Sequence, residues 1–266
     1  MKQKTIWIIS ICILLLAVVA AYFTSSEQAI EPAKDQAVMK EEQQCFPFIK
    51  EPDAGESLHI VGLGDSLTVG VGDDEKKAGY VGEIRKRLSS EDCPITVHNF
   101  STKGYTTTDL LKSLEEEDVI EAVDEAHIIV FTIGANDLVS LAQKDRLQFT
   151  TEAIAETMDQ YEQNIDEIIT RLHKINDEAD IYFIGFYNPL SRAIINDKRL
   201  DTLIKEWNDI SENATAKVED ANFIRTDDIF SEKDKRYLSD DHFHPNHSGY
   251  KKIAERLIEK IEAKGD

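Results

Sequence analysis

The chain has 266 residues, with 30 Lys and Arg against 51 Asp and Glu, so its formal net charge is −21. This acidic balance excludes a general nucleic-acid binder, which needs a basic surface for phosphate contacts, and it argues against docking on anionic lipid. A hydrophobic content of 41% with only 12 Gly and 6 Pro excludes a disordered or fibrous protein.

The first segment of the chain carries lysines ahead of an apolar run. Lys2 and Lys4 precede an uncharged, mostly apolar stretch from Ile6 to Phe23, and polar residues follow it. As a helix this run would span about 27 Å, which is near the lower limit for a membrane span. The pattern predicts a membrane anchor over residues 1–23 that leaves the rest of the chain outside the cytoplasm. A cleaved export signal, cut near Val19–Ala21, is the alternative.

Residues 24–56 are rich in Glu, Gln, Lys, Ala and Pro and show no apolar period, so we predict a polar linker there. One domain is expected over residues 57–266. Cys45 in the linker and Cys93 in the domain form one disulfide in an oxidising compartment or remain two free thiols, and the sequence leaves both open. Neither lies in a C-x-x-C spacing, so they do not indicate a zinc or redox centre.

The domain contains five short apolar runs of the kind that form buried strands. Each is nearly continuous in apolar residues, which is typical of strands buried on both faces of a parallel sheet. The runs are Leu58–Leu63, Ile95–Asn99, Ile128–Ile133, Ile181–Phe186 and Asn222–Ile224.

Helical periods follow some of these runs. Apolar residues recur in steps of three and four from Ile154 to Ile175, from Leu203 to Ala214 and from Ile253 to Ile261, which gives each helix one apolar stripe. Alternating strands and helices predict an α/β fold, a three-layer α/β/α sandwich around a parallel sheet of about five strands. In such folds chemistry gathers beyond the carboxyl ends of the strands, so the segments that follow the strands are the candidates.

The segment after the first strand reads Gly64-Asp65-Ser66-Leu67. Small residues allow a tight turn into a helix, which would expose the Ser66 hydroxyl as a nucleophile if a base lies nearby. An ordinary turn is the competing interpretation. A dinucleotide-binding glycine motif that starts at Gly62 is disfavoured, because its third glycine would fall at Leu67.

Two further segments offer groups that can stabilise a negatively charged oxygen. Gly104, after the second strand, presents its backbone N–H to a ligand or serves only as a turn glycine. Asn136, after the third strand, directs its side-chain amide at a developing oxyanion, or it caps a helix or forms an Asx turn.

The segment from Asp240 to His247, before the last helix, concentrates Asp and His. Asp241 and His244 are three residues apart, a spacing that lets the carboxylate hold one ring nitrogen while the other faces a serine. The density of His and Asp also resembles a metal site, but it lacks the helical H-E-x-x-H pattern. His242 and His247 are expected to be surface or loop-packing residues.

Together these segments resemble the SGNH hydrolases, also called GDSL esterases and lipases. The family's four motif residues correspond, in the same order along the chain, to Ser66, Gly104, Asn136 and His244. The match is clear at Gly64–Leu67, at Gly134–Asp137 and at Asp241–Pro245, and it is weakest around Gly104. The resemblance covers residues 57–263 and implies the family's flavodoxin-like fold.

The resemblance also implies a serine esterase that needs no metal or organic cofactor. Ser66 would attack the ester carbonyl, His244 would act as the base, and Asp241 would orient His244. The backbone N–H groups of Ser66 and Gly104, with the amide of Asn136, would form the oxyanion hole. The expected partner is a small-molecule, lipid or glycan ester, with no nucleic acid and with membrane contact only through residues 1–23.

The acyl specificity is less sharply predicted. Apolar residues follow Asn136 and the fourth strand, and they either line an acyl site or pack between loop and helix. They are Leu138, Val139, Leu141, Ala142, Phe149, Phe186, Tyr187, Pro189 and Leu190. We expect a lipase or lysophospholipase-like esterase, with a carbohydrate O-acetyl esterase as the alternative. A non-catalytic module that binds glycan or lipid and a metal-dependent hydrolase are the alternatives from other classes.

Overall fold

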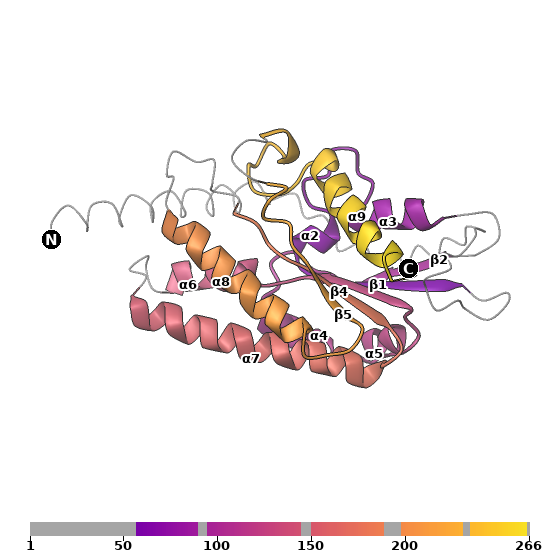
Figure 1. Ribbon diagram of the computed structural model, residues 1–266, viewed down its shortest axis with the longest axis horizontal. Coiled ribbons are helices and arrows are strands. Elements are labelled where there is room, and N and C mark those ends of the chain that lie inside the picture. Colours follow the sequence, from indigo (N-terminus) through magenta and orange to yellow (C-terminus); the bar gives the residue numbers. More distant parts are fainter. Residues whose placement is uncertain (1–56, 90–94, 145–149, 189–197, 231–234, 265–266) are drawn as a thin grey trace, which may run out of the picture.

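The structure, a computed structural model, describes residues 57–89, 95–144, 150–188, 198–230 and 235–264. In these residues strands and helices alternate along the chain (Figure 1). The predicted anchor and linker lie outside the described residues, and so do Cys45 and Cys93. The division of the chain near residues 23 and 56 therefore stays a prediction.

The strands form one sheet in which every neighbouring pair is parallel. They are β1 (Leu58–Gly64), β2 (Ile95–Asn99), β3 (Ile128–Thr132), β4 (Asp180–Ile184) and β5 (Ala221–Ile224). Their spatial order is β2-β1-β3-β4-β5. This order confirms the predicted parallel sheet and its flavodoxin-like topology, and it places the switch point of the sheet between β1 and β3.

Helices connect the strands. The α-helices in the described residues are α2 (Ser66–Val69), α3 (Gly79–Leu88), α4 (Thr107–Ser113), α5 (Glu117–Asp124), α6 (Ala135–Lys144), α7 (Thr151–Ile175), α8 (Lys198–Thr215) and α9 (His247–Glu262). A 3₁₀-helix, η2 (Lys235–Tyr237), precedes α9. The three longest, α7, α8 and α9, contain the three predicted helical periods. Each of the others has ten residues or fewer, which gives periodicity little length in which to appear.

The helices cover both faces of the sheet and confirm the three layers. One face, with strand residues such as Ile60 and Val130, packs against α3 and α9. The other face, with residues such as Val61 and Phe131, packs against α4, α5, α7 and α8. Consecutive strand residues point to opposite faces, so nearly all residues of the three inner strands β1, β3 and β4 are buried. The sequences of these inner strands are mostly apolar for this reason, whereas the edge strand β2 also contains Thr, His and Asn.

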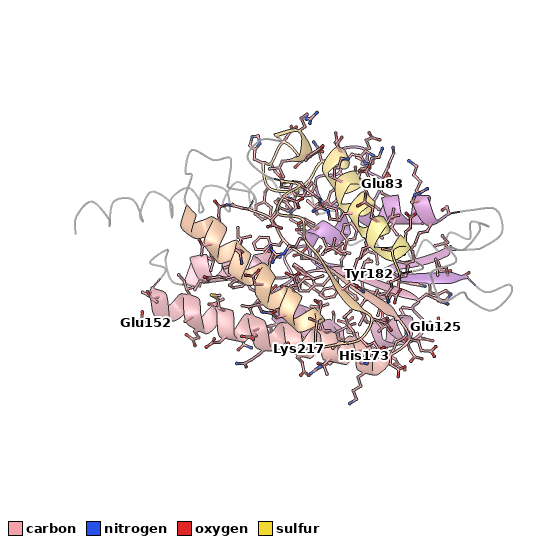
Figure 2. The ribbon with its side chains drawn as sticks, in the orientation of Figure 1. Glu83, Glu125, Glu152, His173, Tyr182 and Lys217 are labelled. Atoms are coloured by element: carbon pink, nitrogen blue, oxygen red, sulfur yellow. The ribbon has the colours of Figure 1, made fainter. Side chains whose placement is uncertain are left out.

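Most of the charged side chains lie on the outside of these layers (Figure 2), although a few, such as Asp65 and Glu83, are buried. Glu125 after α5, Glu152 in the first turn of α7 and Lys217 after α8 are exposed, whereas Tyr182 of β4 is buried. None of the helices in the described ranges is long and apolar enough to cross a membrane.

The end of β1 requires a glycine. Gly64 pairs with Thr132 of β3 and has a φ of +101°, a region in which other residues are strained. A Cβ on Gly64 would lie 1.9 Å from the carbonyl oxygen of Thr132. Asp65, the next residue, donates its backbone N–H to that same carbonyl (3.0 Å). The absence of a side chain at Gly64 thus lets β1 turn directly into α2 beside β3.

We predict that Gly64→Ala destabilises the fold by about 3 kcal/mol, because it combines a positive φ with a clash against backbone. Gly104→Ala is the matched control. Gly104 also has a positive φ (+90°), but a Cβ there meets no atom within 4 Å, so a loss of about 1 kcal/mol is expected. Urea unfolding of both variants and the parent protein measures the difference, and equal losses would contradict the assigned clash.

Candidate active site

The turn after β1 positions Ser66. Oδ1 of Asp65 accepts the N–H of Leu67 (3.0 Å), which caps α2 and makes Ser66 its first residue. The predicted turn from strand to helix is therefore confirmed. The expectation that this turn exposes the Ser66 hydroxyl is wrong, because the ring of His244 lies against it and the residue is only 4% exposed.

The structure brings Ser66, His244 and Asp241 together. Nε2 of His244 lies 2.9 Å from Oγ of Ser66. Nδ1 of the same ring lies 2.6 Å from Oδ2 of Asp241. The ring of His244 is fully buried between these two partners. This is the arrangement that the three-residue spacing of Asp and His predicted.

Asp241 holds the loop as well as the ring. Its Oδ1 accepts the hydroxyl of Ser239 (2.7 Å) and the backbone N–H groups of Phe243 (2.8 Å) and His244 (2.9 Å). Burial alone would raise the pKa of Asp241, but the hydrogen bonds and charge of His244 and the Ser239 hydroxyl lower it well below its ordinary value. The ionised carboxylate accepts the proton on Nδ1, and Nε2 is then able to accept the Ser66 proton.

Tyr187 contacts the segment that carries His244. Its hydroxyl donates to the backbone carbonyl of Phe243 (2.7 Å), and its ring stacks on Phe230 at 3.9 Å between centroids. At 3% exposure it is a packing residue, not part of an exposed lining. The sequence leaves both roles open for Tyr187, and the structure supports the packing one.

The other apolar residues that follow Asn136 and the fourth strand differ in exposure and in whether the structure describes them. Leu138, Val139 and Phe186 are half-buried, and Leu141 is buried. The side chain of Ala142 is not described, and Phe149, Pro189 and Leu190 lie outside the described residues. Among the candidates whose side chains the structure describes, the half-buried ones follow the carboxyl ends of β3 and β4 and still have surface available to a ligand.

Asn136 and Gly104 lie in two segments that are bonded to each other. Nδ2 of Asn136, at the start of α6, donates to the carbonyl of Tyr105 (2.8 Å). An amide group carries two hydrogens, so this bond leaves one for a ligand. The carboxylate of Asp137 accepts the N–H (3.0 Å) and hydroxyl (2.6 Å) of Thr107. Gly104, with open space where a Cβ would stand, is exposed just before this junction.

The remaining histidines of the motif do not join Ser66. His242 is exposed and has a φ of +57°. His247 is the first residue of α9, and its ring packs against the segment before α3 and against α3 itself, with Nδ1 3.2 Å from Asp73 and Nε2 3.6 Å from Glu83. His242 thus agrees with the predicted surface role, and His247 packs as predicted, although it does so from the first turn of a helix. Throughout the described ranges, no group of His, Cys, Asp and Glu is arranged to hold a metal ion.

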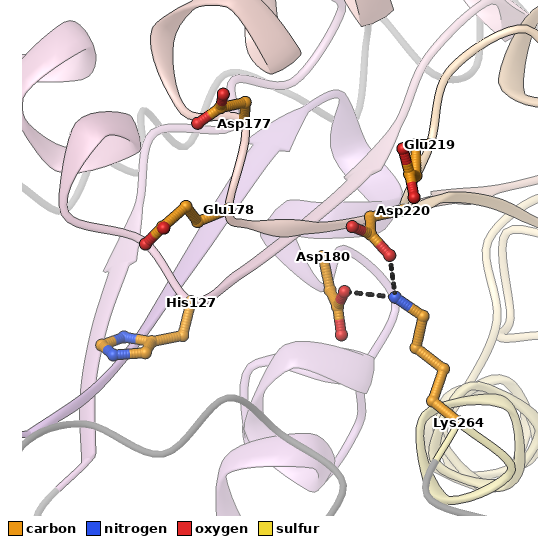
Figure 3. Close-up of a pocket in the computed structure, with 7 residues that line it drawn as sticks. All are labelled: His127, Asp177, Glu178, Asp180, Glu219, Asp220 and Lys264. Atoms are coloured by element: carbon orange, nitrogen blue, oxygen red, sulfur yellow. Dashed lines mark hydrogen bonds and ion pairs between the residues drawn. The ribbon is translucent and has the colours of Figure 1, made fainter.

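A cavity of about 600 Å³ lies at the amino ends of the strands, away from Ser66 (Figure 3). It is lined by His127, Asp177, Glu178, Asp180, Glu219, Asp220 and Lys264. Lys264 reaches into it from the turn after α9 and pairs with Asp180 and Asp220. The lining acids precede β4 or β5 or begin β4, so the cavity belongs to the amino ends of the strands. It is therefore separate from the candidate active site at the carboxyl ends.

Comparisons with known proteins concern the family and the fold of the chain. The model of the GDSL-like Lipase/Acylhydrolase family matches residues 63–252. The uncharacterized protein YpmR of Bacillus subtilis is 32% identical over 269 residues, which covers 100% of this chain and 98% of that protein. The spore germination lipase LipC of Bacillus licheniformis is 26% identical over 206 residues, or 76% of this chain and 95% of that protein.

Among solved structures, the lipase Lip_vut3 from a goat rumen metagenome is similar with a TM-score of 0.67 and 23% identity. The likeness covers 76% of this chain and 97% of that chain. At this identity it supports the fold.

We predict that Asp241→Asn lowers the free energy of unfolding at pH 7, because the variant loses a carboxylate whose pKa is lowered in the folded state. That stabilisation is complete above the pKa of an unfolded Asp, about 4. It is lost as the pH falls toward the lower folded-state value, so parent and variant converge in acid.

Urea unfolding at pH 7 and at pH 3 measures the effect. Asp240→Asn changes the adjacent exposed acid and should alter the free energy of unfolding by less than about 0.5 kcal/mol. A difference between parent and Asp241→Asn that is the same at both pH values would contradict the lowered pKa.

Proposed function

The chain belongs to the GDSL-like lipase/acylhydrolase family and is a carboxylic ester hydrolase, and we propose that it works through an acyl-enzyme on Ser66. The observation that carries the proposal is the continuous hydrogen-bonded chain from Asp241 through His244 to Ser66. A serine hydroxyl is a weak nucleophile at neutral pH. This chain supplies both the base and the group that orients the base.

In the first half of the proposed reaction, Oγ of Ser66 attacks the ester carbonyl carbon and its proton passes to Nε2 of His244. The bond from that carbon to the alcohol oxygen then breaks, and His244 returns the proton to the leaving alcohol. In the second half, water attacks the acyl-enzyme and gives a proton to His244. That proton passes to Oγ of Ser66 as the carboxylic acid leaves. Asp241 stabilises the imidazolium in both halves.

The tetrahedral intermediate of each half carries a negative oxygen, for which we assign three donors. These are the backbone N–H groups of Ser66 and Gly104 and the second amide hydrogen of Asn136. The support is that Asn136 holds the segment of Gly104 through the carbonyl of Tyr105. Donors held before the reaction need no reorganisation as the charge develops.

As the substrate we propose an acyl ester of a lipid. The family description and the 26% identity to a protein named a lipase support this class. The half-buried Leu138, Val139 and Phe186 also suit contact with an acyl chain. A carbohydrate O-acetyl ester is the alternative within the family, and the preferred acyl length separates the two.

We also propose that residues 1–23 anchor the enzyme in a membrane with the domain outside the cytoplasm, or direct its export before cleavage. The support is the sequence pattern of Lys2, Lys4 and the apolar run to Phe23. An exported domain would meet the lipid and glycan esters of the cell envelope.

We predict that Ser66→Ala abolishes both ester turnover and labelling by a fluorophosphonate probe, since the variant lacks the oxygen that forms the covalent bond. The measurement uses p-nitrophenyl acetate, butyrate, octanoate and palmitate, each with and without EDTA. Highest kcat/KM on octanoate or palmitate supports the lipid ester, and activity confined to acetate supports the carbohydrate alternative.

Two results would contradict the serine mechanism. One is unchanged fluorophosphonate labelling of folded Ser66→Ala. The other is turnover that survives Ser66→Ala and is lost with EDTA, which would indicate the metal-dependent alternative. Folded protein that neither turns over an ester nor reacts with the probe would favour the binding module.

We predict that Asn136→Ala lowers kcat by about 10²–10³, as expected for one lost oxyanion donor. Asn136→Asp is the matched variant, because it keeps the size of the side chain but an ionised carboxylate cannot donate. Steady-state kinetics of both variants test the role. A loss below about tenfold in folded Asn136→Ala would remove Asn136 from the oxyanion hole.

A further inference from the structure

A chain of buried hydroxyl groups ends on a carboxylate beside the nucleophile. The hydroxyl of Tyr80 on α3 lies 2.6 Å from Oγ1 of Thr68 on α2. Thr68 Oγ1 lies 2.9 Å from Oγ1 of Thr132 at the end of β3. Thr132 donates in turn to Oδ1 of Asp65 (2.6 Å). All four residues are buried, and none of them belongs to the reaction proposed above.

When Asp65 is ionised, it fixes which hydroxyl of this chain donates and which accepts. A hydroxyl has one proton, and that of Thr132 is used on the carboxylate. The oxygen of Thr132 must then accept from Thr68, and the oxygen of Thr68 must accept from Tyr80. A protonated Asp65 no longer imposes this order, because it can donate as well as accept.

Asp65 also connects the nucleophile to the sheet. Its carboxylate caps α2 through Leu67, on the far side of Ser66, and its backbone N–H binds the carbonyl of Thr132. The carbonyl of Thr68 accepts the side-chain amide of Asn99 on β2 (2.9 Å). The two hydrogen bonds of the Asp65 carboxylate thus hold the first turn of α2, which contains Ser66, and the end of β3.

The surroundings of Asp65 contain one group that can become a cation. The ionisable groups that face it are Asp137 on α6 and His244 before α9, with the phenols of Tyr80 on α3, Tyr161 on α7 and Tyr250 on α9. Of these, only His244 gains positive charge, and in the proposed reaction it does so as Ser66 attacks.

A buried carboxylate without a permanent cationic partner costs stability. Burial raises the pKa of Asp65 to about 6, although the hydrogen bonds from Thr132 and Leu67 and the charge of His244 oppose that rise. Asn at this position would keep the accepting oxygen without the charge. The presence of an acid here is therefore better explained by the reaction than by the fold.

We propose that Asp65 is a positioning residue of the ester hydrolysis, a second carboxylate whose charge aligns the Tyr80–Thr68–Thr132 chain behind Ser66 and favours the imidazolium of His244. The proposal rests on the serine mechanism above. It predicts that protonation of Asp65 contributes to the loss of activity below about pH 6.

The test is Asp65→Asn in the full chain, compared with Asp180→Asn as a matched control. Asp180 has a side chain 15% exposed and lies at the amino end of β4, the end of the sheet away from Ser66. We expect Asp65→Asn to lower kcat about tenfold with KM changed less than about twofold, because the lost charge acts on the transition state. The rate of fluorophosphonate labelling should fall in parallel, and the decline below pH 6 should become shallower. At pH 8 the variant should be at least as stable as the parent.

A second variant keeps the proposal testable if Asp65→Asn does not fold. Thr132→Val keeps the shape of the side chain and removes the donor to Asp65. It should raise the pKa of Asp65 further and move the acid decline of kcat to higher pH.

The outcomes separate this proposal from the function on which it rests. Parent protein that labels at Ser66, together with Asp65→Asn that labels at the same rate with the same acid decline, overturns the positioning role and leaves the serine mechanism intact. Parent protein that does not label at Ser66 overturns the mechanism itself. An Asp65→Asn protein with lower activity, unchanged KM and undiminished stability at pH 8 supports the positioning role.

Discussion

The contact between the ends of β1 and β3 is the constraint on which the candidate site depends. Gly64 can approach Thr132 only because it lacks a Cβ, and Thr132 then serves Asp65 twice, with its carbonyl and with its hydroxyl. Asp65 caps the helix that begins with Ser66. The place of Ser66, the proposed nucleophile, therefore follows from the register of two parallel strands, which a shift of one residue would change completely.

Polar contacts within and between the segments that follow the strands fix the positions of the other site residues. Asn136 and Asp137, beyond β3, hold Tyr105 and Thr107, beyond β2. Asp241 satisfies donors of its own loop with one oxygen and binds the ring of His244 with the other. Unpaired polar groups are costly to bury, so each of these contacts constrains the loops strongly. The motif residues thus maintain the positions of their own neighbours as well as offering groups for chemistry.

Prediction from the sequence succeeded where the signal was local and repeated. The five apolar runs and the three long helical periods were found because burial on both faces of a strand, or on one stripe of a helix, leaves a pattern in neighbouring residues. Asp241 and His244 were paired by spacing. Thr68, Tyr80 and Thr132 were missed, because a hydroxyl inside an apolar strand or a helix carries no signal of its partner.

The sequence by itself determined the class of fold, the five strands and the three longest helices of the domain, and the set of side chains that we propose for ester hydrolysis. Only the tertiary structure decided that Ser66 is covered by His244, that Tyr187 packs against the segment that carries His244, and that Asp65 ends a chain of hydroxyls. The physical reason is distance along the chain: Ser66 and His244 are 178 residues apart. Contacts of this kind depend on the spatial order of the strands, which no local pattern contains.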